Sequence, residues 1–174
     1  MAANVAFRAT TLFNIGDLVV HPLHGVGQVM NVERKQFAQA AQLYYEVAIA
    51  KGTVWVAAET ELAGLRGVTD KDDLPRYRTV LTSSPGPLNR DYHHRRLEVQ
   101  ERLKGGTFQV KCEVVRDLSA YGWPRRLGEV DAALLRRARD SLCQEWAASE
   151  AVTVAEATHE VETLLREGRE TNQK

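Results

Sequence analysis

Two short strands joined by a tight turn are predicted by Phe13-Asn-Ile-Gly-Asp-Leu-Val-Val-His-Pro-Leu-His-Gly-Val-Gly-Gln-Val29. Gly16 and Asp17 interrupt the chain before an apolar run at residues 18–20, and alternating apolar residues resume after Gly25. Between the two runs, a proline fixes one φ angle and glycines permit backbone conformations that a Cβ would forbid. The segment therefore predicts the first hairpin of a small β domain.

Further strands follow at once along the chain. The pattern predicts strands at residues 26–32, 43–49 and 53–56, with a polar, Ala/Gln-rich connection at 34–42 and a hairpin turn at Lys51-Gly52. Strands this short and this close in sequence form hairpins or a small barrel. We therefore expect a β-barrel over the first third of the chain.

After Gly67 the apolar spacing becomes helical. Each predicted helix has one apolar stripe and a polar back, and Thr153 with Glu156 forms a capping box before the last one. The fold class expected is α+β: a small barrel domain at 1–67, with 1–12 flexible, followed by an all-helical bundle of about five helices at 68–174. The helices are expected at residues 70–81, 88–103, 108–120, 129–148 and from 153 to about 168, with a hinge at Thr82-Ser-Ser-Pro-Gly-Pro87.

The 174 residues carry no net charge, but the charge is unevenly distributed. Residues 1–84 hold eight basic and eight acidic residues, 85–126 hold nine and five (+4), and 127–174 hold six and ten (−4). This predicts a local basic face in place of a wholly basic nucleic-acid binder, so any contact with DNA is expected to be modest and strongly salt-sensitive. No apolar stretch approaches the roughly 20 residues that span a bilayer, and residues 1–12 lack a signal-peptide core, so we expect a cytoplasmic protein.

Enzymatic chemistry has no recognisable motif in this chain. The sequence lacks a phosphate-binding glycine loop and a nucleophile elbow, so we expect neither an enzyme nor a cofactor. The histidines at 21, 24, 93 and 94 lack the further ligands that a zinc site needs. Cys112 and Cys143 stand alone among apolar residues, which favours buried free thiols over a disulfide.

Trp55 is a candidate anchor for a protein partner. It alternates with Val54 and Val56, so either the tryptophan or the valine pair faces outward. If the valines fill the barrel, Trp55 lies exposed beside Lys35, in the form of an interaction anchor. The alternative, that the tryptophan covers the end of the barrel as core, stays open.

The densest charge lies in Asn89-Arg-Asp-Tyr-His-His-Arg-Arg-Leu97. Tyr92 shares a helical stripe with Leu88 and Val99, which by itself favours a core position. A second basic row, with Asp140 nearby as an ion-pair partner, is formed by Arg136, Arg137 and Arg139. Such clusters are usually solvated helix faces.

The first hairpin and Val114-Val-Arg-Asp-Leu118 resemble the bacterial CarD/CdnL transcription regulators over residues 13–168. The resemblance implies a Tudor-like module, shared with the transcription-repair coupling factor, that binds the RNA polymerase β subunit. It also implies a helical domain that contacts promoter DNA at the upstream edge of the bubble and stabilises the open complex. In this family a tryptophan wedges into the minor groove, and Tyr92 occupies its position here. We expect Arg116 and Asp117 to form an internal pair.

The resemblance assigns two sets of site residues. RNA polymerase contacts are expected at Lys35, Val54 and Trp55. DNA contacts, without sequence specificity, are expected at Tyr92, His94, Arg95, Arg96, Arg137 and Arg139. The chain is expected to act as a monomer. The alternatives are a protein-interaction adaptor with Tyr92 in its core, a free-standing DNA binder and, least favoured, an enzyme.

Overall fold

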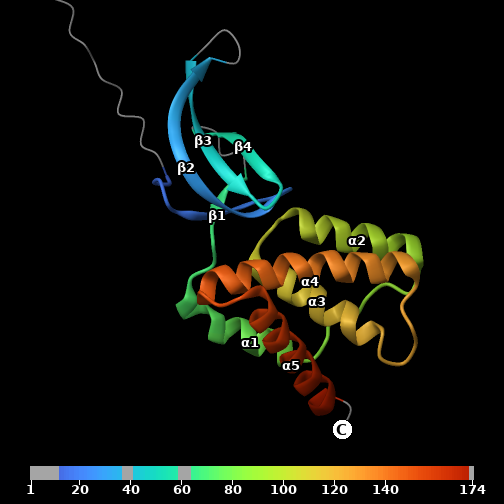
Figure 1. The fold of residues 1–174 in the computed structure, drawn as a ribbon. Helices are drawn as coiled ribbons and strands as arrows, with labels where there is room; N and C mark the ends of the chain where they lie inside the picture. Colours follow the sequence, from blue (N-terminus) through green and yellow to red (C-terminus); the bar gives the residue numbers. More distant parts are fainter. Residues whose placement is uncertain (1–11, 37–40, 59–63, 173–174) are drawn as a thin grey trace, which may run out of the picture. The chain divides into compact units, whose positions relative to one another are not determined.

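The chain forms two compact units, divided between Gly67 and Val68, in the computed structural model (Figure 1). The structure describes residues 12–36, 41–58 and 64–172. The segment 1–11, most of the predicted flexible terminus, lies outside the described residues. The α+β class is confirmed, since strands make up the first unit and helices the second.

The first unit is a five-stranded antiparallel sheet within the described residues. Its spatial order is β4-β3-β2-β1-β5, so β4 and β5 are its two edges. The hairpin turn after residue 21 is confirmed, and the second turn lies at residues 50–51, one residue earlier than predicted, because Gly52 begins β4. Strands β2 and β3 extend through most of the predicted 34–42 connection. The two-residue β5, which pairs with β1, was not predicted. The strands are β1 (Leu18–His21), β2 (Gly25–Gln36), β3 (Ala41–Ile49), β4 (Gly52–Ala57) and β5 (Arg66–Gly67).

The sheet bends around a core built from alternate residues of its strands. Its buried members are Val19, Val29, Tyr45, Val47 and Val56. The Tyr45 hydroxyl accepts hydrogen bonds from the N–H groups of residues 12 and 13, which holds the incoming chain against this core. A Cβ at position 27 would lie 2.6 Å from the Val47 side chain and 2.7 Å from a β3 carbonyl. Close strand packing therefore explains one glycine of the first hairpin.

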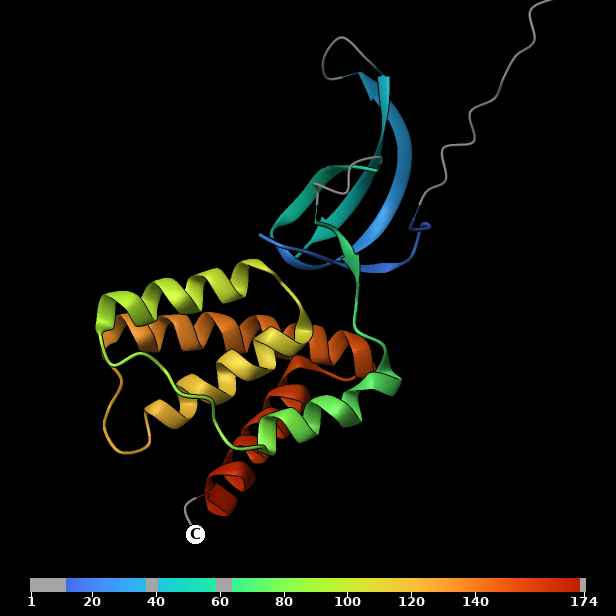
Figure 2. The same cartoon turned by 180° about the vertical axis from the view of Figure 1, so that it is seen from behind.

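The second unit contains five helices in its described part. In both views α4 runs between α2 and α5 (Figures 1 and 2). Trp146 and Leu142 of α4 are fully buried in the shared core, and both cysteines are buried free thiols, as predicted. Burial raises the pKa of each thiol. A 3₁₀ turn, η2 (Lys71–Asp73), precedes α1 (Leu74–Thr82), α2 (Tyr92–Lys104), α3 (Phe108–Tyr121), α4 (Glu129–Glu150) and α5 (Val154–Asn172).

Three helix boundaries differ from the prediction by about four residues, and the first is the start of α1, which begins at Leu74 after the 3₁₀ turn. Helix α2 begins at Tyr92, four residues late, because Asn89 accepts a hydrogen bond from the Asp91 N–H and forms a local turn. Asp91 then caps the helix by accepting from the His94 N–H. Helix α5 begins at the predicted capping box but continues through Gly168, where an added Cβ would lie 3.1 Å from the backbone of α1. That glycine permits close helix packing.

The predicted hinge at 82–87 is wrong. The division between the units lies fifteen residues earlier, and residues 83–91 connect two helices of the second unit. Gly86 donates its N–H to Asp117 of α3, so this Pro-rich segment is fastened to the bundle. None of the described helices has the length and apolar character needed to cross a membrane.

Candidate functional site

Trp55 lies on the outer face of the sheet. Val56 is buried and Val54 packs against the core, so the side chain between them points the other way. The Lys35 Nζ lies 3.0 Å from the centre of the Trp55 ring and 2.9 Å from Glu33 Oε1. The geometry matches the alternative in which the valines fill the sheet core. It removes the Val54 side chain from the expected contact surface, because that side chain belongs to the core.

The outer edge of β4 offers backbone groups for pairing. The Ala58 N–H donates to the Leu43 carbonyl at 2.8 Å, which marks these two residues as a hydrogen-bonded pair of the β3–β4 ladder. Because such pairs alternate along antiparallel strands, Thr53, Trp55 and Ala57 direct their N–H and C=O groups away from β3. Within the described residues no strand pairs with that edge. The same strand thus presents Trp55 and an edge that no described strand occupies.

Tyr92 stands at the first residue of α2 and is 37% exposed. It packs edge-on against His93, with ring centres 5.0 Å apart, and is absent from the core that contains Val99. Leu88 contacts that core from the loop before the helix. The predicted stripe of Leu88, Tyr92 and Val99 is therefore not formed, because the helix starts too late to include the leucine. The aromatic ring remains accessible.

Arg95 is the main correction among the expected DNA contacts. It is 5% exposed, and its Nη2 and Nε donate to Asp131 Oδ2 at 2.7 and 3.0 Å. Its Nη1 donates to the carbonyls of Asn89 and Arg90 and to the Tyr121 hydroxyl. Because this guanidinium is buried and its donors are engaged, Arg95 is not available to phosphate. It fixes the loop that leads into Tyr92.

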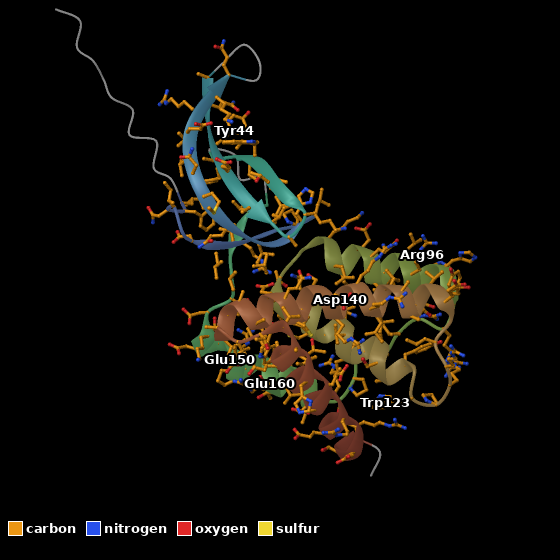
Figure 3. All side chains as sticks on the ribbon, in the orientation of Figure 1. Tyr44, Arg96, Trp123, Asp140, Glu150 and Glu160 are labelled. Carbon is orange, nitrogen blue, oxygen red and sulfur yellow. The ribbon has the colours of Figure 1, made fainter. Side chains whose placement is uncertain are left out.

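His94 and Arg96 remain on the surface of α2. The His94 ring nitrogen lies 2.9 Å from the Asp91 carboxylate, so this histidine is part of the helix cap. Arg96 is exposed and forms no ion pair with the residues that the structure describes (Figure 3). Arg90, just before the helix, is likewise exposed, and no described ion pair involves its side chain, so Arg90 and Arg96 are the basic side chains near Tyr92 that remain accessible.

The basic row on α4 divides between two flanks of the helix. Arg139 ion-pairs with Glu162 of α5 at 3.3 Å. Arg137 is two residues away, about 200° around a helix of 3.6 residues per turn, and so lies on the flank away from α5. It is exposed and forms no ion pair among the described residues, and the pairing with Asp140 that the sequence allowed for these arginines is not formed there. Arg137 therefore lies on the flank of α4 away from α5, whereas Arg139 faces α5.

Two buried polar clusters fix the framework of the bundle. The predicted Arg116–Asp117 pair is confirmed at 2.7 Å, but Asp117 also accepts from Arg102, which the sequence did not suggest. The second cluster was missed: Glu145, with 0% exposure, pairs with Lys111 at 2.9 Å and accepts from the Thr69 hydroxyl. Through Thr69, this cluster fastens the chain where it enters the bundle.

The histidines show no metal-binding arrangement in the described ranges. His21 and His24 stack with ring centres 4.6 Å apart, and no group of three His, Cys, Asp or Glu side chains converges there. Partial burial, together with the neighbouring His24, lowers the pKa of His21. Among the site residues expected from the sequence, accessible side chains lie on the β4 surface, at the start of α2 and on the flank of α4.

Comparison with known proteins agrees with this division into two units. Residues 13–66 match the CarD-like/TRCF RID domain, an RNA polymerase-interacting domain, and residues 77–162 match the C-terminal domain of CarD. The chain is also 28% identical over 137 residues to YdeB of Bacillus subtilis (strain 168), which is named as a candidate transcription factor. That match covers 77% of this chain and 90% of YdeB. Since both domain types occur here in order, the chain belongs to the CarD family of non-enzymatic transcription regulators.

Proposed function

We propose that this protein docks on the RNA polymerase β subunit through its sheet and contacts promoter DNA through its helical unit. The contact lies at the upstream edge of the transcription bubble and stabilises the open complex. The observation that carries the proposal is the exposed Tyr92, which stands beside Arg96 at the start of a helix that Arg95 and Asp131 hold in place.

The surface of β4 supports docking by strand addition. A partner strand can pair with the N–H and C=O groups of Thr53, Trp55 and Ala57, which fixes orientation with little demand on sequence. Trp55 and Lys35 add a side-chain contact next to that edge, and a tryptophan with a nearby cation is typical of residues that dominate interface energy. The sheet thus supplies both alignment and affinity.

The start of α2 supports a contact with deformed DNA. The face of Tyr92 stacks on a base step that has opened, while Arg96 and Arg137 contact the flanking phosphates. Tyrosine has less stacking area than the tryptophan of family relatives, so the expected wedge is weaker. These contacts carry no base-edge recognition, which agrees with binding that is independent of sequence.

The open complex is stabilised if the helical unit binds melted DNA more tightly than closed duplex DNA. Docking on polymerase raises the local concentration of the helical unit near DNA, so that weak contacts become effective. If Tyr92 stacks only on melted DNA, each 1.4 kcal/mol gained by that contact raises the ratio of open to closed complexes about tenfold. A modest contact is therefore sufficient for regulation.

The test is the lifetime of open complexes formed by bacterial RNA polymerase on a promoter fragment, measured after addition of a competitor. Tyr92→Ala is expected to shorten the lifetime toward that without the protein, and Tyr92→Trp to lengthen it. Trp55→Ala is expected to abolish the effect by loss of polymerase binding. The matched control is Arg166→Ala on the exposed face of α5. Equal lifetimes for wild type and both Tyr92 variants, with polymerase binding retained, would contradict the DNA contact.

A further inference from the structure

The helical unit contains an open cavity of about 430 Å³ at the carboxyl end of α3. The loop before α2 forms one wall with Pro85, Pro87 and Leu88, and the opposite wall includes Tyr121 and Trp123. This volume lies in the range of ligand pockets, which are lined mainly by apolar and aromatic groups. Trp123 is only half-buried (Figure 3), and the proposed DNA contact makes no use of it.

Two arginines lie at this cavity. Arg125 lines it and donates to the Tyr121 hydroxyl at 2.8 Å, with its guanidinium carbon 5.2 Å from the centre of that ring. Arg169 of α5 lies over Trp123, 5.9 Å from the ring centre. Neither Arg125 nor Arg169 has an acidic partner in the part of the chain that the structure describes, so the rim is positively charged.

The acidic group in the wall does not offset this charge. Asp117 lines the cavity, but its carboxylate accepts from Arg116 and Arg102 and from the Gly86 N–H. Its charge and its acceptor capacity are already engaged within the bundle. A ligand entering the cavity therefore meets apolar walls, two aromatic rings and cationic donors at the rim.

We propose that this cavity binds an acidic linear segment of a partner protein. An apolar side chain of the segment fills the cavity, and its carboxylates pair with Arg125 and Arg169. Trp, Tyr and Arg are the residues that most often dominate protein interfaces. An unpaired nucleobase fits less well, because its polar edges would face the carbon-rich walls without hydrogen-bond partners. The site is separate from Tyr92 and does not rest on the proposed DNA contact.

The test is to select a random twelve-residue peptide library on the full-length protein and to measure the enriched peptides by fluorescence anisotropy. We expect sequences in which Asp or Glu flank a Phe, Leu or Trp. Trp123→Ala is expected to weaken binding about 30-fold, as for a central aromatic anchor. Arg125→Glu is expected to weaken it by about tenfold or more, and added salt to weaken it further, because the attraction is electrostatic.

Matched variants separate binding from folding. Arg166→Glu makes the same charge change elsewhere on the surface and is expected to leave peptide affinity unchanged, and Trp123→Phe to retain most of it. Circular dichroism checks that every variant is folded. The proposal is overturned if no peptide distinguishes wild type from a folded Trp123→Ala, or if the selected peptides are neutral or basic. It is also overturned if oligothymidylate binds more tightly than the peptides and loses affinity in Trp123→Ala, which would identify a nucleic-acid site.

Discussion

Removal of the Arg95–Asp131 pair is expected to separate the stability of the bundle from the placement of Tyr92. The two side chains are 6% and 2% exposed, and Nη2 lies 2.7 Å from Oδ2. Breaking a buried pair on one side leaves the other charge without compensation, which costs about 3–5 kcal/mol. Asp131→Leu and Arg95→Met are therefore each expected to destabilise the helical unit by about this amount.

The double variant Arg95→Met/Asp131→Leu leaves no buried charge behind. Asp131 Oδ1 accepts no hydrogen bond from the described residues, so the native pair is not fully satisfied either. What the double variant still loses is the set of three hydrogen bonds from Nη1 to two loop carbonyls and the Tyr121 hydroxyl, about 1 kcal/mol each. We expect the double variant to lower the free energy of unfolding by about 3 kcal/mol, whereas the effects of the two single variants would sum to about 6–10 kcal/mol.

The assay combines urea unfolding with open-complex lifetimes. Circular dichroism at the helix band follows the second unit, because the first contains strands. Although the double variant regains stability, its loop carbonyls have lost their donor, so Tyr92 is no longer fixed and the lifetime is expected to stay short. Additive destabilisation would refute the coupling between the two charges. A wild-type lifetime in the double variant would refute the positioning role of Arg95.

Three further predictions concern other parts of the molecule. Gly27→Ala is expected to destabilise the sheet by about 2 kcal/mol or more, because the added methyl group clashes with β3. The loss is measured as faster amide hydrogen exchange in β3. Gly128→Ala is the control and is expected to have little effect, because open space surrounds its added methyl group. Arg137→Glu is expected to reduce the affinity of the protein for the polymerase–promoter complex, and the salt dependence of that affinity, more than Arg139→Glu does. The reason is that Arg139 is already paired with Glu162. Equal effects of the two variants would contradict the assignment of the two arginines to different flanks of α4. Hydrogen bonds from Thr153, the N-cap of α5, lower the pKa of Glu156 below its ordinary value. The ionised carboxylate therefore stabilises the fold above the ordinary pKa, and this stabilisation is lost as acid protonates the group. The free energies of unfolding of wild type and Glu156→Gln are expected to differ at pH 7 and to converge in acid.

The sheet and most helix positions were predictable because local patterns specify them. Alternation around Val19, Val29 and Val47 places one face in the core, and glycines mark the turns. The strand at residues 66–67 was not predictable, since two residues carry no period and are ordered only by pairing with β1. Boundaries depended on individual side chains, as with Asn89 before α2.

The site was less predictable because tertiary partners determine it. Neighbouring arginines at 95 and 96 look alike in sequence, but one is buried on Asp131, 36 residues later, and the other faces solvent. Leu97 is an apolar residue that the usual preference would place in the core, but it is 59% exposed. The segment 82–87 has the composition of a linker, yet Asp117 fastens it to α3. Such contacts are invisible to local patterns.

The most direct measurement is photocrosslinking from a benzoylphenylalanine placed at position 92 in the full-length protein, with position 166 as the control. The account predicts crosslinks from position 92 to promoter DNA at the upstream edge of the bubble, only when polymerase is present, and none from position 166. Crosslinks from position 92 to protein alone, or equal DNA crosslinks from both positions, would contradict the central claim.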